Sequence, residues 1–444
     1  MLEQFVLQVQ KVARRTGLDD FELLLTLSTS IDVRIENREI TIQLKRDIFS
    51  GSLRVLKRSR LGFIPFTEPS SALLELGIRS ALSQTQPAPF NSFAVIDGQT
   101  PSTVAFDREV VKLLNAPAKI KDLARNLMQR AWETGRVETL EGMLHLSQET
   151  RLFTTMHTSR PVIAERTAFS AFAEVNTRDF DFVAGRKLPE LMQVTQLAES
   201  VARNLPATES DPETERLKGK KIPVILDPVF TEEMLRRLVA EHLYASTVQE
   251  GMSRYQLETQ VMSPLITLSD DATMPFGEST FPVDDEGTPA RRNLIVKDGI
   301  LKQFLYDRTA AVRENRESTG NGRHRPVLIE EEHEAPVRCT INDILIEPGT
   351  TPLKEMIRQI EHGLLVKVLL GFHTANRTTG DFANTLYFGR IIRHGELTDL
   401  PAAGRWSVSG NALELMRKIT LVSKETKTTG SAVLPWLLSE LTVG

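Results

Sequence analysis

The sequence predicts an α+β fold with two domains, an N-terminal mixed α/β domain over residues 1–205 and a C-terminal β-rich domain with long loops over residues 222–444. First, helical segments are separated by several consecutive strands, which is typical of an α+β arrangement and not of regular βαβ alternation. Second, residues 206–221 lack aromatic residues and β-branched runs, as linkers do. Third, 444 residues are enough for two or three domains.

The first half begins with a predicted helix over residues 2–16, because apolar residues recur at helical spacing and Gly17 is a stop signal. Four short strands are expected between residues 21 and 66, where short apolar runs are separated by polar or Gly-containing connections. The remaining predicted elements are a helix over 69–82, a Pro-containing loop over 85–103, a long helix over 107–134, strands over 135–183 and a helix over 187–204.

The second half opens with a predicted strand over residues 222–226 and a helix over residues 231–246. Short strands bounded by Gly, Asp and Pro then predominate, which indicates a β-rich domain with loops long enough to hold functional residues. These strands are expected at 265–268, 294–296, 301–305, 344–346 and 364–370, with one helix over 353–362.

Charge and composition exclude several classes of protein. The 54 Lys and Arg residues are balanced by 58 Asp and Glu residues, which argues against a dedicated nucleic-acid binder. The single cysteine, Cys339, excludes an internal disulfide framework and a cysteine-cluster metal site. No signal segment or membrane-spanning apolar run is visible, so we expect a cytoplasmic protein.

Four short motifs rich in Gly, Asp and Asn are the main candidates for chemistry. They are Asp284-Asp-Glu-Gly-Thr288, Ser318-Thr-Gly-Asn-Gly-Arg323, Glu347-Pro-Gly-Thr350 and Thr379-Gly-Asp-Phe382. Each could bind an ion or a substrate main chain through exposed amides and carboxylates. Each could equally be a turn, since these residue types tolerate left-handed backbone. The chain contains no phosphate-binding loop, strand-linked dinucleotide fingerprint or nucleophile elbow.

The order and spacing of these motifs resemble the TldD/PmbA family, originally called modulators of DNA gyrase and regarded as zinc metalloproteases. The resemblance is specific over the second half. It is carried by Leu226-Asp-Pro228, Asp284-Asp-Glu-Gly-Thr-Pro289, Lys297-Asp-Gly-Ile-Leu301, Asp307, the motifs beginning at Ser318 and Thr379, Ile346-Glu-Pro-Gly349 and Gly430-Ser-Ala-Val-Leu-Pro435. The first half matches mainly in Gly51-Ser-Leu-Arg-Val55 and Gly62-Phe63.

The resemblance implies one of two kinds of subunit. The TldD-like kind holds zinc with a His-Glu-x-x-x-His helix and a distant cysteine, and its Glu acts as general base. The PmbA-like kind, also called TldE, lacks this set and pairs with the first kind around an enclosed proteolytic chamber. In this sequence, if His242 matches the second His, Arg237 occupies the first position and Leu238 replaces the Glu. The matching C-terminal cysteine is also absent from residues 421–430.

The sequence therefore predicts a PmbA/TldE-like, catalytically inactive subunit of a zinc metalloprotease complex that acts on peptides or loosely folded proteins. We expect no catalytic residue and no cofactor on this chain, with zinc on a TldD-like partner in a heterodimer; a homodimer is the other possible assembly. The residues expected to line the chamber or contact substrate are Asp284, Asp285, Glu286, Gly287, Gly320, Asn321, Arg323, Gly380 and Asp381.

The alternative is a stand-alone homodimeric peptidase or peptide-binding protein with an unrecognised metal site. Its weak candidate ligands are His242, Glu331, His333 and Glu334, since imidazoles and carboxylates are zinc-competent. The last three residues could equally belong to a solvated loop. The basic clusters are small and scattered, so neither direct nucleic-acid binding nor membrane binding is expected.

Overall fold

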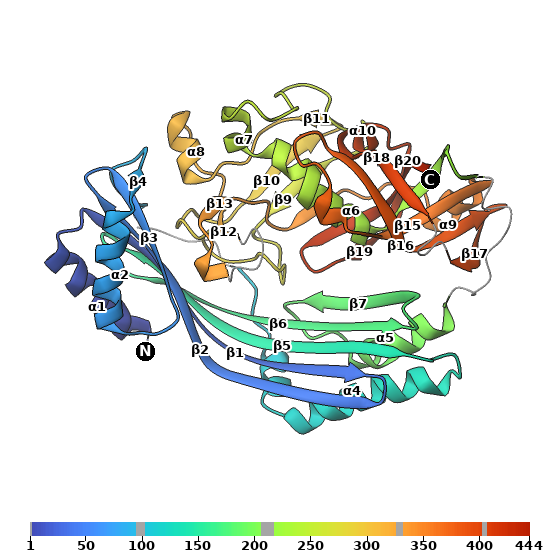
Figure 1. Cartoon of the computed structure of the whole chain (residues 1–444), viewed down its shortest axis with the longest axis horizontal. Coiled ribbons are helices and arrows are strands. Elements are labelled where there is room, and N and C mark those ends of the chain that lie inside the picture. The colour runs from blue at the N-terminus through green and yellow to red at the C-terminus, as the bar shows by residue number, and fades with distance from the viewer. Residues whose placement is uncertain (1, 95–102, 206–216, 326–331, 402–405) are drawn as a thin grey trace.

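The computed structural model describes residues 2–94, 103–205, 217–325, 332–401 and 406–444. It contains two large sheets, each built from strands of one half of the chain, with helices packed against them (Figure 1). The predicted α+β class is confirmed. Residues 206–216 of the predicted linker lie outside the described residues, so the domain boundaries stay a prediction. None of the described helices is long and apolar enough to cross a membrane.

The N-terminal sheet has seven antiparallel strands in the order β4-β3-β2-β1-β5-β6-β7. Their bounds are β1 (Asp20–Glu36), β2 (Glu39–Lys57), β3 (Arg60–Phe66), β4 (Gln86–Pro87), β5 (Leu140–Thr155), β6 (Val162–Val175) and β7 (Asp179–Gly185). The prediction of four short strands over residues 21–66 is wrong, because β1 and β2 are long and continuous. The polar residues Ser28 to Ser30 stay paired with β5, and a register shift against β2 absorbs the irregularity.

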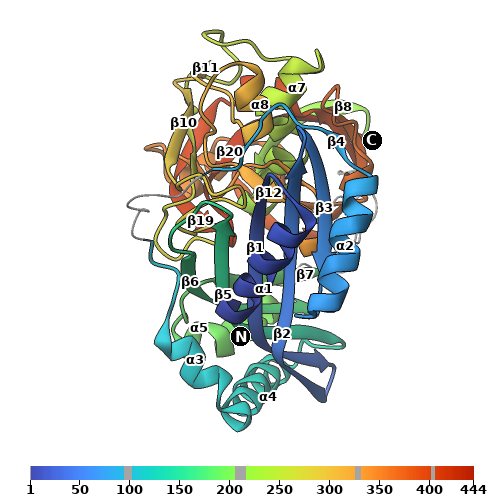
Figure 2. The same cartoon turned by 90° about the vertical axis from the view of Figure 1, so that its left-hand side faces the viewer.

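Two groups of helices cover different ends of this sheet (Figure 2). They are α1 (Leu2–Thr16) with α2 (Ser71–Ser83), and α3 (Arg108–Leu114) with α4 (Pro117–Glu133) and α5 (Leu191–Arg203). Each group of helices packs on the sheet to form its own hydrophobic core, and strand β1 contributes to both. Leu23 and Leu25 pack with the first group, and Ile31 and Val33 pack with the second. The helical stretch predicted over 107–134 is confirmed, but it is divided into α3 and α4, because Pro117, which has no N–H to donate, begins a new helix.

The C-terminal sheet is mixed, and part of it closes on itself. Its path runs β11-β10-β9-β14-β20-β18-β16-β15-β8, and a further pairing of β20 with β8 joins the last five strands into a ring. The bounds are β8 (Lys220–Leu226), β9 (Leu268–Asp271), β10 (Arg292–Lys297), β11 (Ile300–Leu301), β14 (Ile344–Ile346), β15 (His362–Leu370), β16 (Asp381–Arg393), β17 (Glu396–Pro401), β18 (Ser407–Asn411), β19 (Leu421–Thr428) and β20 (Ala432–Val443). A separate hairpin pairs β12 (Gly322–His324) with β13 (Val337–Cys339).

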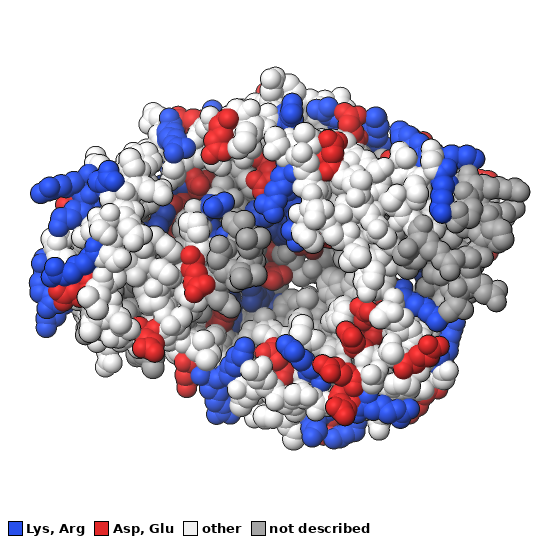
Figure 3. Space-filling view, in the orientation of Figure 1, with Lys and Arg blue, Asp and Glu red and all other residues white. Residues whose placement is uncertain are grey.

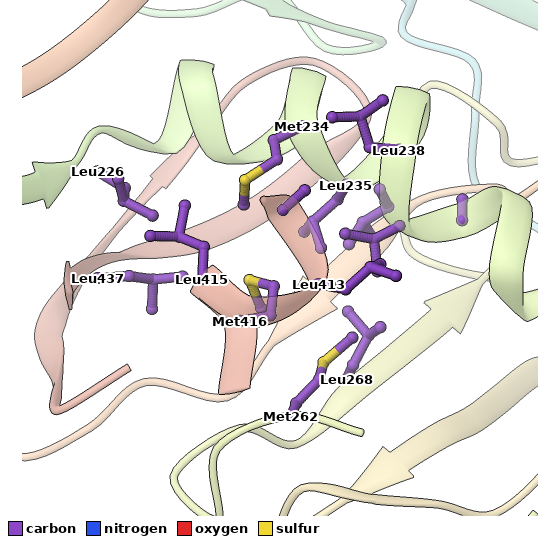
Figure 4. Packing of buried hydrophobic residues seen from close by; sticks show 14 of the residues in the cluster. Leu226, Met234, Leu235, Leu238, Met262, Leu268, Leu413, Leu415, Met416 and Leu437 are labelled. Atoms are coloured by element: carbon purple, nitrogen blue, oxygen red, sulfur yellow. The ribbon is translucent and has the colours of Figure 1, made fainter. Parts of the chain in front are cut away.

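One irregular helix runs through the core of this half. It begins as α6 (Pro228–Met234), widens into a π-helical turn (Leu235–Val239), tightens into a 3₁₀ turn (Ala240–Leu243) and ends before α7 (Ala245–Gln249). The predicted helix over 231–246 is therefore confirmed as a helical segment, although its turns change from α to π to 3₁₀ along its length. The apolar side of this helix packs against α10 (Ala412–Arg417), β8 and β20 (Figure 4). The other short helices are α8 (Arg308–Arg313) and α9 (Leu353–Arg358).

Candidate functional site

A cleft of about 910 Å³ lies beside this irregular helix. One wall is the helix itself, and the other comes from the β12–β13 hairpin and the loops near it. The charged and polar residues that line it are Glu232, Glu233, Arg236, Arg237, Glu241, His242, Tyr244, Glu250, Asp307, Arg325, Arg338, Cys339 and Arg377. The cleft thus contains Arg237 and His242, which the sequence analysis compared with the zinc motif, together with the single cysteine, Cys339.

Two acidic residues of the helix wall, Glu232 and Glu233, are paired with arginines one turn away. Arg236 Nε donates to Glu232 at 2.9 Å, and Arg237 Nε donates to Glu233 at 3.0 Å. Arg236 also donates to the carbonyls of Asn342 and Ser431, so it ties the helix to neighbouring loops. These contacts neutralise the charges of Arg236 and Arg237 with glutamates of the same helix.

The π-helical turn explains how Arg237 and His242 reach the same cleft. They are five residues apart, and a π turn closes with a hydrogen bond between residues five apart, here from the Ala240 N–H to the Leu235 carbonyl. Leu238 turns away from the cleft and is fully buried in the apolar core (Figure 4). A carboxylate at position 238 of this chain would enter the core and not the cleft.

His242 is fully buried, and its ring nitrogens are oriented by the main chain. Its Nδ1 accepts a hydrogen bond from the Arg254 N–H at 3.1 Å, which places the proton of the neutral ring on Nε2. Burial and then the charge of Arg254 lower the pKa of His242, while the Arg377 main chain acts in the opposite direction. Metal ligation through Nε2 would move the proton to Nδ1, where it would meet the Arg254 N–H. His242 is therefore poorly oriented as a ligand.

The residues of this cleft do not fit a zinc ion. Arg237 brings a positive charge to the cleft, the neighbouring Leu238 lies in the apolar core and offers no ligand, and His242 has its Nδ1 occupied. Cys339 is buried, and burial raises the pKa of its thiol, which disfavours the thiolate that metals bind. Across the described residues, no group of three or more His, Cys, Asp or Glu side chains is arranged to hold a metal ion.

The other weak candidates for metal ligands lie on a different surface. Glu332, His333 and Glu334 form a short 3₁₀ turn, and His333 lines a second cleft of about 760 Å³ against β1 and β2. Glu332 forms an ion pair with Arg151 of β5. Glu331 lies outside the described residues.

The predicted site residues Asp284, Asp285 and Glu286 are almost fully buried. Asp284 organises its own turn, since it accepts hydrogen bonds from the Glu286, Thr288 and Gly322 N–H groups at 2.8–3.0 Å. Gly287 adopts the left-handed conformation that the turn requires, with φ of +79°. Burial raises the pKa of Asp284 to about 8, and the charge of Glu286 acts in the same direction. These side chains contact protein groups instead of open cleft.

The same turn receives two arginines from the N-terminal sheet. Arg54 of β2 lies between Glu22 of β1 and Glu286, with contacts of 2.7 and 2.8 Å. Arg151 of β5 lies 3.7 Å from Asp285. Burial acts to raise the pKa of Asp285, but the charges of Arg323 and Arg151 outweigh it and lower the pKa to about 2. This buried network of charges joins the two halves of the chain.

The second predicted motif surrounds a buried carboxylate that sequence reasoning missed. Asp270 accepts hydrogen bonds from the side-chain amides of Asn293, Asn321 and Asn342 at 2.9–3.2 Å. Gly320, at φ of +76°, makes the adjoining turn. Arg323 donates to Asn342 Oδ1 at 3.0 Å and to Asp285. The structure thus brings the motifs around Asp284 and Asn321 together in one polar network.

Gly380 and Asp381 belong to a separate turn beside α10. Asn411, the N-cap of α10, donates to Asp381 Oδ1 at 2.7 Å, and this hydrogen bond lowers the pKa of Asp381. Gly380 has φ of +82°. Among the described residues, no hydrogen bond or ion pair links this turn to the motifs around Asp284 and Asn321. Its neighbours Arg377 and Thr378 do reach the first cleft.

Comparison with known proteins shows to which family the chain belongs. The model of the PmbA/TldA metallopeptidase C-terminal domain matches residues 219–444, half of the chain. The chain belongs to the TldD/PmbA family. The resemblance drawn from the motifs beginning at Asp284, Ser318 and Thr379 is therefore confirmed.

Curated relatives match over a similar part of the chain. A metalloprotease of Methanocaldococcus jannaschii is 30% identical over 221 residues, which are 47% of this chain and 46% of that protein. A metalloprotease TldD homolog of Buchnera aphidicola is 28% identical over 207 residues, 46% of this chain and 41% of its own. The match therefore spans less than half the length of these relatives.

Solved structures share the fold over the whole chain. A Thermotoga maritima protein named as a modulator of DNA gyrase has a TM-score of 0.81 at 21% identity, with all of both chains covered. TldE from Thermococcus kodakarensis has a TM-score of 0.79 at 21% identity and covers 98% of this chain and 99% of its own. These two proteins thus share the fold of this chain.

Proposed function

We propose that this chain is a catalytically inactive, PmbA/TldE-like subunit of a zinc metalloprotease complex that acts on peptides or loosely folded proteins. What supports it is the chemistry beside the cleft: if His242 matches the second His of the active kind of subunit, Arg237 and Leu238 occupy the positions of its first His and its Glu. A guanidinium repels a divalent cation, and a buried leucine cannot accept a proton from water.

The proposed partner is a TldD-like subunit that supplies the zinc and the general base. The family assignment and the TldE-like fold support such a pairing. In the complex, this chain would contribute walls and contacts for an extended peptide. Main-chain recognition suits substrates of varied sequence, because it reads backbone groups instead of side chains.

Direct action on DNA is not part of the proposal. On the face in Figure 3, acidic and basic side chains are interspersed, whereas a phosphate backbone is usually met by a surface of one sign. We place the protein in the cytoplasm, where a chain with one buried free cysteine needs no oxidising environment.

The proposal is tested by metal analysis of the purified chain together with peptidase assays, with and without a TldD-like subunit from the same genome. We expect no stoichiometric zinc and no cleavage by the chain alone, and chelator-sensitive cleavage of an unfolded peptide on mixing. Stoichiometric zinc or chelator-sensitive cleavage by the lone chain would contradict the proposal. That result would favour the stand-alone peptidase, and the region around His333 would then be searched first.

A further inference from the structure

The wall of the cleft opposite the helix contains two arginines that have no acidic partner among the described residues. Arg325 directly follows β12, and Arg338 lies in β13 of the same hairpin. The helix-wall arginines Arg236 and Arg237, by contrast, are both paired with glutamates. The hairpin therefore presents positive charge to the cleft that the helix wall does not neutralise.

Tyr244 adds a buried hydroxyl group next to these arginines. The residue is only 3% exposed, and its hydroxyl oxygen accepts hydrogen bonds from the Ile341 N–H at 3.3 Å and from Arg325 Nη1 at 3.4 Å. A phenol also has one O–H to donate. Within the described parts of the chain, no acceptor is bonded to that O–H. A buried donor without an acceptor costs free energy, so an acceptor from a ligand would be favourable here.

We infer that Tyr244, Arg325 and Arg338 form a binding site for a single carboxylate, the C-terminal carboxylate of a peptide. The planar fork of a guanidinium matches the two oxygens of a carboxylate, and charge-assisted hydrogen bonds of this kind are stronger than neutral ones. The Tyr244 O–H would donate to one of the same oxygens. The two arginines supply the charge, and the tyrosine supplies the orientation.

The acidic residues of the cleft favour a singly charged ligand over a phosphate. Glu241 and Asp307 line the same cleft, and the nearest arginine contact of Glu241, with Arg377, is a loose 3.9 Å. Repulsion from these carboxylates grows with the charge of the ligand and offsets the extra attraction that a dianion would gain from the arginines. A carboxylate of an acidic side chain has the same charge as a chain terminus, and the experiment must separate these two sources.

This inference deepens the proposed function by naming the end of the peptide that the chain would hold. It needs only this chain, because all three residues lie in one cleft. It can therefore fail while the subunit role stands, and it can hold even if the chain proves to act alone.

The test is a calorimetric or NMR titration of the purified full chain with trialanine and with trialanine amide. We expect the free acid to bind at least about tenfold more tightly than the amide, because only the acid offers a charged acceptor. Two further probes are inorganic phosphate and acetyl-Ala-Glu-Ala-amide, which carries only a side-chain carboxylate, and both should bind more weakly than trialanine. Equal binding of acid and amide would overturn the site, and equal or tighter binding of either further probe would overturn its assignment to a chain terminus.

Variants distinguish this cleft from other surfaces. Arg325→Gln and Arg338→Gln should each weaken binding of the acid by about tenfold, and Tyr244→Phe should weaken it by about fivefold. None of the three should change binding of the amide. Arg125→Gln, on the exposed face of α4, removes the same charge far from the cleft and should leave acid binding unchanged. Unaltered acid binding by the Arg325→Gln/Arg338→Gln double variant would overturn the inference, and a circular dichroism spectrum checks that each variant is folded.

Discussion

Arg54 is the single residue whose removal should affect stability most, because it lies buried between carboxylates from both halves of the chain. Its guanidinium bonds Glu22 of β1 and Glu286 of the C-terminal half. We expect Arg54→Met to lower the free energy of unfolding by about 3–5 kcal/mol, since it leaves two buried carboxylates without their cation. Urea denaturation measures this change.

The matched control for Arg54 is an arginine in an exposed pair. Arg125 bonds Asp122 within α4 at 2.6 Å, and both side chains are largely exposed. Because water screens such pairs, Arg125→Met should cost only about 0.5 kcal/mol. Equal losses in the two variants would contradict the importance assigned to the buried network.

Asp343 should make the free energy of unfolding depend on pH. It is fully buried and accepts hydrogen bonds from the Ser279 N–H, and burial raises its pKa to about 7. Between its ordinary pKa of 3.8 and this value, the folded chain holds more protons than the unfolded chain. Its contribution to stability is therefore full below the ordinary pKa and is lost as the pH rises toward about 7, by up to about 1.4 kcal/mol per pH unit.

The Asp343→Asn variant should remove this dependence, because an amide oxygen can still accept from Ser279 but does not titrate. We expect the decline of its unfolding free energy with rising pH to be shallower than that of the wild type. Asp122→Asn, at an exposed position, should keep the wild-type slope. Urea denaturation at a series of pH values measures all three slopes, and identical slopes for wild type and Asp343→Asn would refute the prediction.

At the scale of elements, the irregular helix determines whether substitutions can create a zinc site in the cleft. Arg237→His should fold, since position 237 is only partly buried, and it should not bind zinc stoichiometrically, since His242 is poorly oriented and a third ligand is missing. Adding Leu238→Glu should destabilise the protein by several kcal/mol, because the new carboxylate would enter the apolar core. Metal analysis after dialysis and urea denaturation measure these outcomes. Zinc-dependent cleavage by the double variant alone would show that our account of the cleft is wrong.

The hairpin of β10 and β11 depends on a glycine that other residues cannot replace. Asp298 and Gly299 make its two-residue turn with φ of 49° and 80°, and a Cβ on Gly299 would lie 2.5 Å from the Met262 carbonyl oxygen. We expect Gly299→Ala to cost about 2–4 kcal/mol, from backbone strain and steric overlap together. Gly135→Ala, at φ of +69° with no atom within 4 Å of its Cβ, should cost about 1 kcal/mol. Thermal unfolding of both variants separates the cost of backbone strain, which both share, from the cost of steric overlap, which only Gly299→Ala has.

These elements also show how far sequence reasoning reached. The motifs around Asp284 and Asn321 were predictable as turns, because Gly, Asp and Asn tolerate the left-handed backbone conformations that turns require. The burial of these motifs could not be predicted, since their partners Arg54 and Arg151 lie in strands far away in the sequence. Only the tertiary fold brings them together. The change from α-helix to π-helix at Leu235 could not be predicted either, because no local residue pattern indicates it. Strand β20 was not among the predicted strands; it contains Pro435, and pairing on both sides holds it in place.

At the scale of the whole molecule, ion pairs join the two halves at separate places. One is the buried network of Arg54 and Arg151. The other lies at β7, where Lys367 and Lys427 of the C-terminal sheet bond Asp179 and Asp181 at 2.8 and 2.7 Å. Because these contacts are spread along the interface, neither sheet can separate without losing several of them.

We therefore expect the wild-type chain to unfold in one calorimetric transition, and the Arg54→Met/Arg151→Met double variant to unfold in two. In the double variant, the buried carboxylates of both halves lose their shared cations, so the interface no longer couples the two cores. Lys427→Met removes a cation from the more exposed pair with Asp181 and should keep a single transition. Two transitions in the wild type would mean that the halves unfold independently, and one in the double variant would mean that other contacts, and not the buried network, couple them. Two in Lys427→Met would mean that the interface at β7 is as important as the buried network.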